Sequence, residues 1–206
     1  MDKLIDDLIK LAFAEDIGDG DHTTLCCIPE TAMGKSQLII KEDGVLAGVE
    51  MAKRIFHDFD PELKMTVFIQ DGAEVKKGDI AFVVEGKIQS LLQTERLMLN
   101  VMQRMSGIAT TTRKYAKALE GTKTHVLDTR KTTPGMRMIE KEAVRIGGGM
   151  NHRIGLFDMI LLKDNHVDFA GGIEQAITRA QNYLKEKGKS LKICLLYTSD
   201  AADDMQ

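Results

Sequence analysis

Residues 124–163 read "THVLDTRKTTPGMRMIEKEAVRIGGGMNHRIGLFDMILLK" and alternate between two kinds of local pattern. The short apolar segment "THVLD" (124–128) predicts a buried strand. The segment "RMIEKEAVRI" (137–146) has helical periodicity, and Gly147 follows it where a helix C′ residue is expected. The segment "DMILLK" (158–163) predicts a second strand. The stretch therefore predicts a strand, a loop, a helix and another strand in succession.

The same alternation continues downstream. "GGIEQAITRAQNYLKEKG" (171–188) predicts a helix, and "SLKI" (190–193) predicts the start of a third strand. Strands that alternate with helices form parallel sheets, either in a barrel or in a doubly wound sheet. In both architectures the ligand site lies at the C-terminal ends of the strands.

The first half of the chain follows a different pattern, typical of a small α+β domain on an antiparallel sheet. We expect helices over 3–14 and 48–59, a loop over 15–24, a strand–turn–strand hairpin over 36–48 with its turn at Asp43-Gly44, and β-structure over 64–88. Residues 90–119 predict two helices that meet near Ser106-Gly107.

Cationic side chains follow the predicted strands. Arg130 and Lys131 come directly after the first strand, and Lys163 ends the second. His152 and Arg153 lie between them. Because crowded cations repel one another unless an anion binds them, the group predicts an anion site. Arginine suits bidentate contacts with carboxylate or phosphate groups, and lysine acts as a point charge.

Each of these residues also has a plainer interpretation. Arg130 or Lys131 alone would be a solvated loop cation, and His152 alone a surface histidine. Gly147, Gly148 and Gly149 could bring the backbone close to a phosphate, although they lack the order of a P-loop or dinucleotide fingerprint. The anion site is predicted from the group, not from any one member.

Composition excludes several classes of protein. The net charge of −3 over 206 residues provides no field that would recruit nucleic acid or an anionic membrane. No apolar run approaches the ~20 residues of a membrane-spanning helix. The three cysteines form neither a disulfide framework nor a metal-binding spacing, which indicates a reducing cytoplasm. His22 and His57 lack ligand partners at metal spacing.

Three longer motifs resemble one family. They are "QRMSGIATTT" (103–112), "DTRKTTPGMR" (128–137) and "EKEAVRIGGGMNHRIGLFDMILLKDNH" (140–166), and "EDIGDGDHTT" (15–24) fits the same pattern. Together they resemble quinolinate phosphoribosyltransferase, over about residues 10–193.

The resemblance implies an α/β fold: an N-terminal α/β sandwich domain with a linking helix over 1–106, then a partial, TIM-like α/β barrel over 107–193. It implies a pentosyltransferase of de novo NAD biosynthesis that converts quinolinate and phosphoribosyl pyrophosphate to nicotinate mononucleotide, pyrophosphate and carbon dioxide. Mg²⁺ would accompany phosphoribosyl pyrophosphate, with no organic cofactor. The family works as a homodimer in which one N-terminal domain covers the partner's barrel.

The resemblance also implies roles for the cations. Arg130, Arg153 and Lys163 resemble carboxylate-binding residues, with His152 beside them. Lys131 resembles the lysine that meets phosphoribosyl pyrophosphate, so that Lys131 and Lys163 are the catalytic candidates. Arg104 resembles an arginine donated across the dimer interface. No metal ligands are predicted, because the family's metal-associated carboxylates come later than residue 193.

After "SLKI" the family pattern stops. The tail "CLLYTSDAADDMQ" (194–206) resembles a translated sequencing adapter, and a divergent natural C-terminus is the alternative. Under the adapter interpretation residues 194–206 have no function. About three barrel strands remain, which are too few to close a barrel. We therefore expect this chain to be inactive.

Other functions stay open from the sequence. One is a related type II phosphoribosyltransferase acting on nicotinate or associated with molybdenum transport; another is a non-catalytic fragment. A Schiff-base aldolase could use Lys163. "DGAEVKKGDIAFVVEG" (71–86) is similar to biotinyl and lipoyl carrier domains, but the lysine at a hairpin tip is missing.

Overall fold

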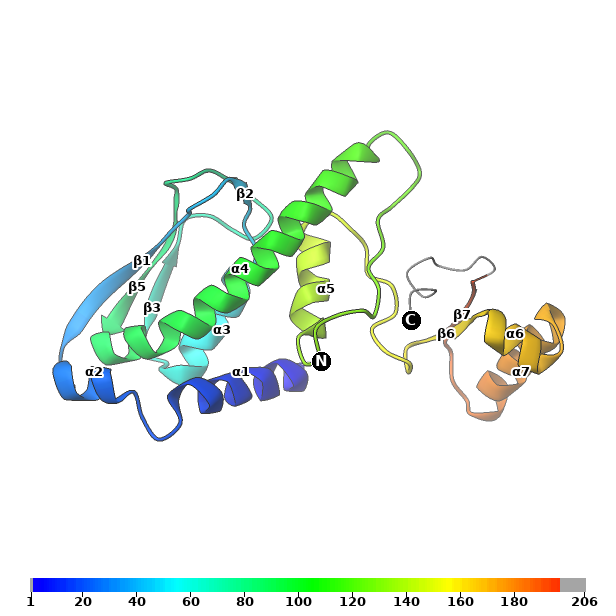
Figure 1. Ribbon diagram of the computed structural model, residues 1–206, viewed down its shortest axis with the longest axis horizontal. Helices are drawn as coiled ribbons and strands as arrows, with labels where there is room; N and C mark the ends of the chain where they lie inside the picture. Colours follow the sequence, from blue (N-terminus) through cyan, green and yellow to red (C-terminus); the bar gives the residue numbers. More distant parts are fainter. Residues whose placement is uncertain (1, 197–206) are drawn as a thin grey trace. The chain divides into compact units, whose positions relative to one another are not determined.

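The computed structural model describes residues 2–196, which fall into two compact units that meet between His152 and Arg153 in the chain (Figure 1). The described residues of the first unit are 2–152, and those of the second are 153–196. This division differs from the predicted domain boundary after residue 106, which falls inside a helix. The predicted domain boundaries stay a prediction.

The chain begins with two helices. Helix α1 spans Asp2–Ile17, and α2 spans His22–Cys27. In α1 the Ile9 side chain is buried in the core, whereas Leu4 and Leu11 are exposed. The loop predicted over 15–24 is shorter than expected, because Asp21 caps α2 by accepting a hydrogen bond from the Thr24 amide.

The first unit contains the predicted antiparallel sheet. Its strand order is β1-β5-β3, with β1 at Met33–Ile39, β5 at Ile80–Lys87 and β3 at Lys64–Val67. A separate pair joins β2 (Gly44–Val45) to β4 (Glu74–Val75).

The hairpin predicted at Asp43-Gly44 is wrong, because β1 pairs with β5 while β2 pairs with β4. After the turn, Gly44 and Val45 instead contact Thr110 of a long helix. The Val45 amide donates to Thr110 Oγ1 at 2.9 Å, and Gly44 passes so close to Thr110 that a Cβ would lie 2.7 Å from that oxygen.

Two helices cover the sheet. Helix α3 (Val49–Phe59) and helix α4 (Ile88–Ala118) pack against it, and α4 crosses its face (Figure 1). Phe82 of β5 is buried and meets Phe56 of α3 edge-on, with ring centroids 6.3 Å apart. The core of this unit therefore lies between the sheet and these helices.

The break predicted near Ser106-Gly107 is also wrong, because α4 is one helix of 31 residues. Glycine within a helix costs only about 0.5–1 kcal/mol relative to alanine. Tertiary contacts offset that cost: Ser106 Oγ accepts from the Ala47 amide at 3.0 Å and donates to the Ala47 carbonyl at 3.1 Å.

Helix α5 spans Arg137–Ile146, as predicted. Gly147 is the C-cap residue of α5 and has a right-handed helical conformation. The left-handed C′ residue, predicted at Gly147, is Gly148, with φ 96°. The strand predicted over 124–128 is reduced to one parallel bridge, Leu127 to Met150. No second strand flanks this segment within residues 2–196, and Leu127 is 53 % exposed.

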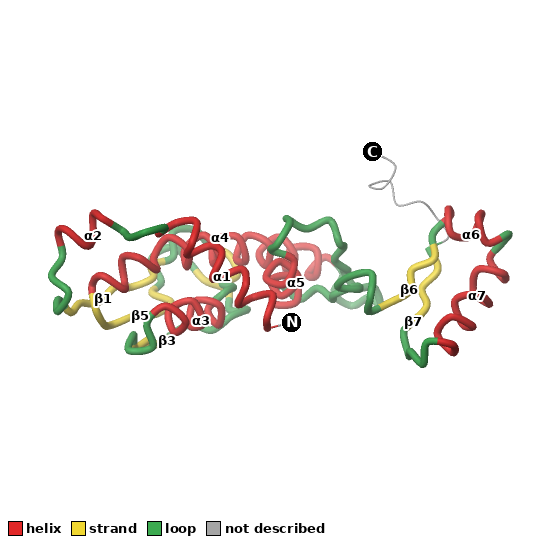
Figure 2. Tube along the Cα trace, turned by 90° about the horizontal axis from the view of Figure 1, so that it is seen from below, coloured by secondary structure: helices red, strands yellow, loops and turns green. Residues whose placement is uncertain are grey.

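The second unit keeps the predicted strand–helix alternation. Strand β6 (Met159–Leu162) runs parallel to β7 (Lys192–Leu195), and α7 (Ile173–Glu186) connects them after an additional short helix, α6 (Asp164–Ala170). Figure 2 shows α6 and α7 beside this strand pair.

These elements confirm the fold class: an α/β chain in which an antiparallel-sheet domain precedes a parallel α/β part. The described residues form no closed barrel. Strand β7 includes Cys194 and Leu195, the first of the tail residues, which pair with Leu161 and Leu162. Residues 197–206 of the predicted tail lie outside the described part.

Candidate active site

The Pro134-Gly135 step makes a tight turn in front of α5. The Met136 amide donates to the Thr133 carbonyl at 3.0 Å, and Gly135 has φ 79°. Proline at the second position and a left-handed glycine at the third are typical of a type II turn. The turn therefore directs the cationic loop 128–133 back along α5.

Arg104 fastens this loop to α4 and α5. Its Nε donates to Glu140 Oε1 at 2.6 Å, and a terminal nitrogen donates to Thr133 Oγ1 at 2.5 Å. Glu140 is buried, and its second oxygen accepts from the Thr133 amide at 3.2 Å. In this single chain Arg104 thus contacts its own loop, and its predicted donation across a dimer interface stays a prediction.

A buried ion pair lies at the start of the loop. Lys141 of α5 donates to Asp128, and the two side chains are only 2 % and 6 % exposed. Asp128 Oδ1 also accepts from the His152 amide at 2.8 Å, and Lys141 Nζ donates to the His152 carbonyl at 3.3 Å. Asp128 and Lys141 therefore hold the backbone of His152 next to the loop.

Asn151 extends this network. With its amide nitrogen turned toward the pair, Asn151 donates to Asp128 Oδ2 and to the Lys141 carbonyl, each at 2.9 Å. Assigning the nitrogen to that side follows from the hydrogen-bonding partners. The Asp128 carboxylate then receives donors on both oxygens, which a buried charge requires.

Arg130 carries an unpaired donor. Its Nε is buried and has no hydrogen-bond acceptor among the described residues. The Arg130 carbonyl accepts from Arg137 at 3.2 Å, and Arg137 Nε also donates to Thr132 Oγ1 at 3.0 Å, so the backbone of the loop is fixed. Lys131 beside it is exposed, and its amide donates to Thr129 Oγ1 at 3.1 Å.

The glycine run has a packing role, and the hypothesis that it approaches a phosphate is wrong here. The amides of Gly147, Gly148 and Gly149 already donate to carbonyls of α5, at 2.9, 3.0 and 3.0 Å. A Cβ on Gly147 would lie 2.6 Å from the Ala109 carbonyl oxygen of α4. Arg113 of α4 caps the same turn by donating to the Gly147 carbonyl at 3.0 Å.

Arg153 and Lys163 belong to the second unit. A terminal nitrogen of Arg153 donates to the carbonyl of Met159, the first residue of β6, at 3.4 Å. Lys163 follows the last residue of β6 and is half-buried, and its amide donates to His166 Nδ1 at 3.0 Å. Within this unit the structure does not gather Arg153 and Lys163 at one end of β6, and their shared role stays a prediction.

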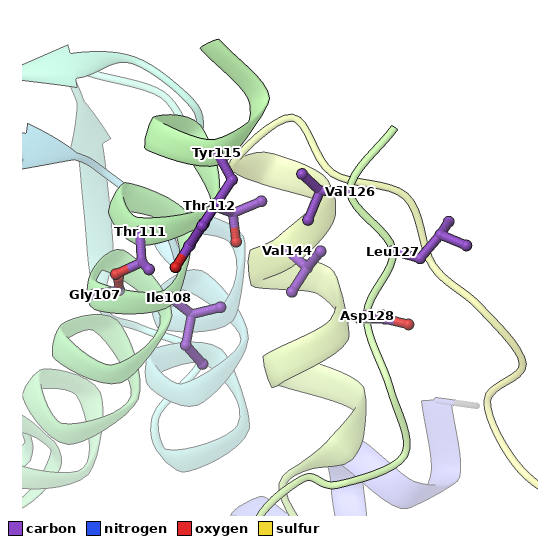
Figure 3. Close-up of a pocket in the computed structure, with 9 residues that line it drawn as sticks. All are labelled: Gly107, Ile108, Thr111, Thr112, Tyr115, Val126, Leu127, Asp128 and Val144. Carbon is purple, nitrogen blue, oxygen red and sulfur yellow. The ribbon is translucent and has the colours of Figure 1, made fainter. Parts of the chain in front are cut away.

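A cavity of about 440 Å³ lies beside the cationic loop. Figure 3 shows side chains of α4 facing the segment 126–128 and Val144 of α5. The lining residues are Gly107, Ile108, Thr111, Thr112, Tyr115, Val126, Leu127, Asp128 and Val144. The lining is mainly apolar and contains none of the predicted cations, so we do not assign a charged substrate to it.

Neither a metal centre nor a membrane-spanning helix is found in the part of the chain that the structure describes. Across residues 2–196 no three His, Cys, Asp or Glu side chains are arranged to hold a metal ion. No helix in the same range is long and apolar enough to cross a membrane.

Comparison with solved structures gives a match over most of the chain. NadC from Streptococcus pyogenes is 40% identical, with a TM-score of 0.85, over 94% of this chain and 68% of that one. The model of the quinolinate phosphoribosyl transferase N-terminal domain matches residues 21–106, and that of the C-terminal domain matches residues 108–202. The chain belongs to the quinolinate phosphoribosyltransferase family.

Curated relatives agree with this family. Quinolinate phosphoribosyltransferase [decarboxylating] 1 of Nicotiana glauca is 47% identical over 180 residues, which are 87% of this chain and 51% of that protein. The chloroplastic nicotinate-nucleotide pyrophosphorylase [carboxylating] of Arabidopsis thaliana is 46% identical over 187 residues. The chain spans about half the length of these two relatives.

The sequence alone missed three members of the loop network. Glu140, Lys141 and Asn151 lie within a motif that marks the family, yet they were not predicted as site residues. Glu140 and Lys141 are both buried in α5. Nothing in the local sequence marks these three residues, because charged side chains on a helix indicate a solvated face.

Proposed function

We propose that the complete protein transfers the phosphoribosyl group of phosphoribosyl pyrophosphate to quinolinate, forming nicotinate mononucleotide, pyrophosphate and carbon dioxide for NAD biosynthesis. Family membership and the cationic loop support this proposal. Quinolinate carries two adjacent carboxylates, and their recognition calls for several arginine and lysine donors. The cationic loop 128–133 offers such donors, and Arg104 is hydrogen-bonded to its last residue, Thr133.

The observation that carries the proposal is the buried, unpaired Nε of Arg130. A buried donor without an acceptor costs about 1–3 kcal/mol. A carboxylate that approaches the guanidinium edge would supply the acceptor and form a charge-assisted hydrogen bond. Since the Arg130 backbone is fixed by Arg137, this donor is already positioned for an anion.

The proposed chemistry follows from charge. The pyridine nitrogen of quinolinate attacks C1 of the ribose as pyrophosphate leaves, through a transition state with oxocarbenium character. Lys131 would meet phosphoribosyl pyrophosphate, while Arg130, Arg153 and Lys163 would hold the carboxylates beside His152. Positioning and electrostatic stabilisation are the expected contributions of these residues. The same cations would then stabilise the charge that develops as the C2 carboxylate is lost.

Asp128 and Lys141 would act as positioning residues for this site. Their buried pair holds the His152 amide and carbonyl, so it fixes the point at which the chain passes to Arg153. Mg²⁺ would enter bound to phosphoribosyl pyrophosphate. We assign it no ligand among the described residues. A cytoplasmic location stays a prediction; the names of some plant relatives place those proteins in chloroplasts or mitochondria.

The test is quinolinate binding by the complete protein, measured by calorimetry. Arg130→Ala should weaken binding by about 2–5 kcal/mol, the cost of losing one partner of a buried charge pair, which is at least about 30-fold. The matched control, Arg145→Ala, removes an exposed arginine that pairs with Glu142 on α5 and should leave binding unchanged. Equal affinity of the Arg130 variant and the wild type would contradict the proposal.

Arg153 gives a second ligand comparison. Arg153→Ala should weaken quinolinate more than phosphoribosyl pyrophosphate, because its guanidinium is assigned to a carboxylate. Equal losses for both ligands would show that assignment to be wrong. Nicotinate, with one carboxylate fewer than quinolinate, should bind more weakly than quinolinate to the wild-type protein; tighter binding of nicotinate would favour the related nicotinate enzyme.

We also propose a homodimer in which Arg104 reaches the partner's site. Such a dimer would require Arg104 to exchange its contacts with Glu140 and Thr133 for contacts across the interface. Mixing complete Arg104→Ala and Arg130→Ala chains tests this exchange. If Arg104 acts in the partner's site, the mixed dimer contains one site with both arginines and regains activity. No recovery in a verified mixed dimer would place Arg104 in its own subunit's site.

A further inference from the structure

Two adjacent cysteines end helix α2, on a surface that takes no part in the candidate active site. Cys26 and Cys27 are both exposed, and their sulfur atoms lie 3.5 Å apart. The Cys26 sulfur also contacts the Thr23 carbonyl at 3.4 Å. Neither side chain is part of the hydrophobic core. Both sulfurs are therefore accessible together to a reagent from solvent.

The backbone beneath the two cysteines is held at both ends. At the start of α2, Asp21 accepts from the Thr24 amide at 3.1 Å, and Thr24 is buried. At the end, the Ile28 amide donates to the Thr24 carbonyl at 2.9 Å. The Gln89 side chain of α4 donates to the Ile28 carbonyl at 2.7 Å. The backbone positions that carry the two cysteine side chains are thus set by an anchored helical turn.

The geometry of the two cysteines disfavours a direct disulfide between them and favours a bridging atom that binds both sulfurs. Consecutive Cα atoms across a trans peptide lie about 3.8 Å apart, whereas disulfides usually join Cα atoms about 4.4–6.8 Å apart. A direct bond between Cys26 and Cys27 would therefore require the last turn of α2 to rearrange. An atom that binds both sulfurs at once bridges the gap and leaves the turn in place.

We propose that Cys26 and Cys27 form a dithiol site for a trivalent arsenical. With an arsine oxide, two arsenic–sulfur bonds form and the arsenic–oxygen bond breaks. The two thiol protons leave with the oxide oxygen as water, and no electrons are transferred, so no oxidant is needed. This site is independent of phosphoribosyl transfer, and its test does not depend on activity.

The test is intact-protein mass spectrometry after treatment with phenylarsine oxide, followed by an excess of the monothiol glutathione. One phenylarsenic group bridging two sulfurs should survive the glutathione on the wild-type chain. Cys194→Ser is the matched control and should keep the adduct, because Cys194 lies in the second unit. Cys26→Ser and Cys27→Ser should each lose it completely.

A second arm tests the geometry with oxidised glutathione, a low-molecular-weight disulfide. Mixed disulfides with glutathione should accumulate, while the intramolecular disulfide, seen as a loss of two hydrogens, should not. Circular dichroism establishes that each serine variant folds as the wild type does. An adduct that persists in either serine variant, no adduct on the wild type, or rapid formation of the intramolecular disulfide would each overturn the proposal.

Discussion

Replacing Lys141 by methionine removes one partner of the buried ion pair while keeping an unbranched side chain of similar length. Lys141 is 2 % exposed and Asp128 is 6 % exposed, so the variant leaves the Asp128 carboxylate buried without its cation. Breaking a buried pair in this way costs about 3–5 kcal/mol. Because the His152 amide and Asn151 still donate to Asp128, we expect the lower end, about 3 kcal/mol.

The assay is urea unfolding of the chain, followed by circular dichroism at low protein concentration. Arg145→Met on the same helix is the matched control, because Arg145 and Glu142 form an exposed pair, and exposed pairs contribute about 0–1 kcal/mol. The free energy of unfolding of an ordinary domain is about 5–15 kcal/mol in total, so the loss expected for Lys141→Met is a large fraction of it.

A double variant separates burial of charge from loss of packing. Adding Asp128→Asn to Lys141→Met removes the uncompensated charge and should recover part of the lost free energy of unfolding. Losses that simply add would mean that Asp128 and Lys141 are not coupled. If Lys141→Met and Arg145→Met fall within about 1 kcal/mol of each other, the buried network does not stabilise the loop as argued.

Further predictions concern stability and association. The Ser90 hydroxyl, which donates to Asp60 at 2.6 Å, is the main cause that holds the pKa of Asp60 below its ordinary value. This stabilisation is present above the unfolded pKa of about 3.9 and is lost as pH falls through the lower folded pKa. Ser90→Ala should therefore lower the free energy of unfolding by about 2 kcal/mol near pH 7. The difference in unfolding free energy between the variant and the wild type should become smaller below about pH 4. A difference that does not change with pH would contradict this. Gly149→Ala places a Cβ 2.8 Å from Val144 and should destabilise by about 1–3 kcal/mol, whereas Gly107→Ala, in open space within α4, should stabilise by about 0.5–1 kcal/mol; thermal melts that show the same sign for both would refute the packing role. The exposed apolar side chains of the second unit predict self-association of the 206-residue chain; a monodisperse monomer in sedimentation would contradict it.

Local periodicity was sufficient to predict the elements that bury one face. The helices over 49–59 and 173–186 and the strand at 159–162 were found because their apolar spacing is regular. The parallel pairing of β6 and β7 followed from the strand–helix alternation. These features depend on residues near one another in the chain.

The errors arise where distant residues decide the structure. The Asp43-Gly44 signal predicts a hairpin locally, but Thr110, 65 positions after Val45, takes the Val45 amide. Ser106-Gly107 resembles a helix break, but Ala47 holds Ser106 in one continuous helix. Neither partner can be identified from local sequence, because only the folded chain brings them together.

In the candidate site, too, some residues can be predicted from local sequence and others cannot. Arg130 and Lys131 could be selected as an anion-binding pair from their charge and their place after a predicted strand. The residues that hold their loop could not be selected in the same way. Lys141 and Glu140 carry charges that suggest a solvated helix face, and only their partners, Asp128 and Arg104, explain why both are buried.

The central claim is that these cations serve the transfer of a phosphoribosyl group to quinolinate. The most direct measurement is product chromatography with the complete protein, quinolinate, phosphoribosyl pyrophosphate and Mg²⁺. We predict that nicotinate mononucleotide appears together with pyrophosphate, and that omission of quinolinate abolishes both products. No nicotinate mononucleotide under these conditions, or equal product formation when nicotinate replaces quinolinate, would contradict the claim.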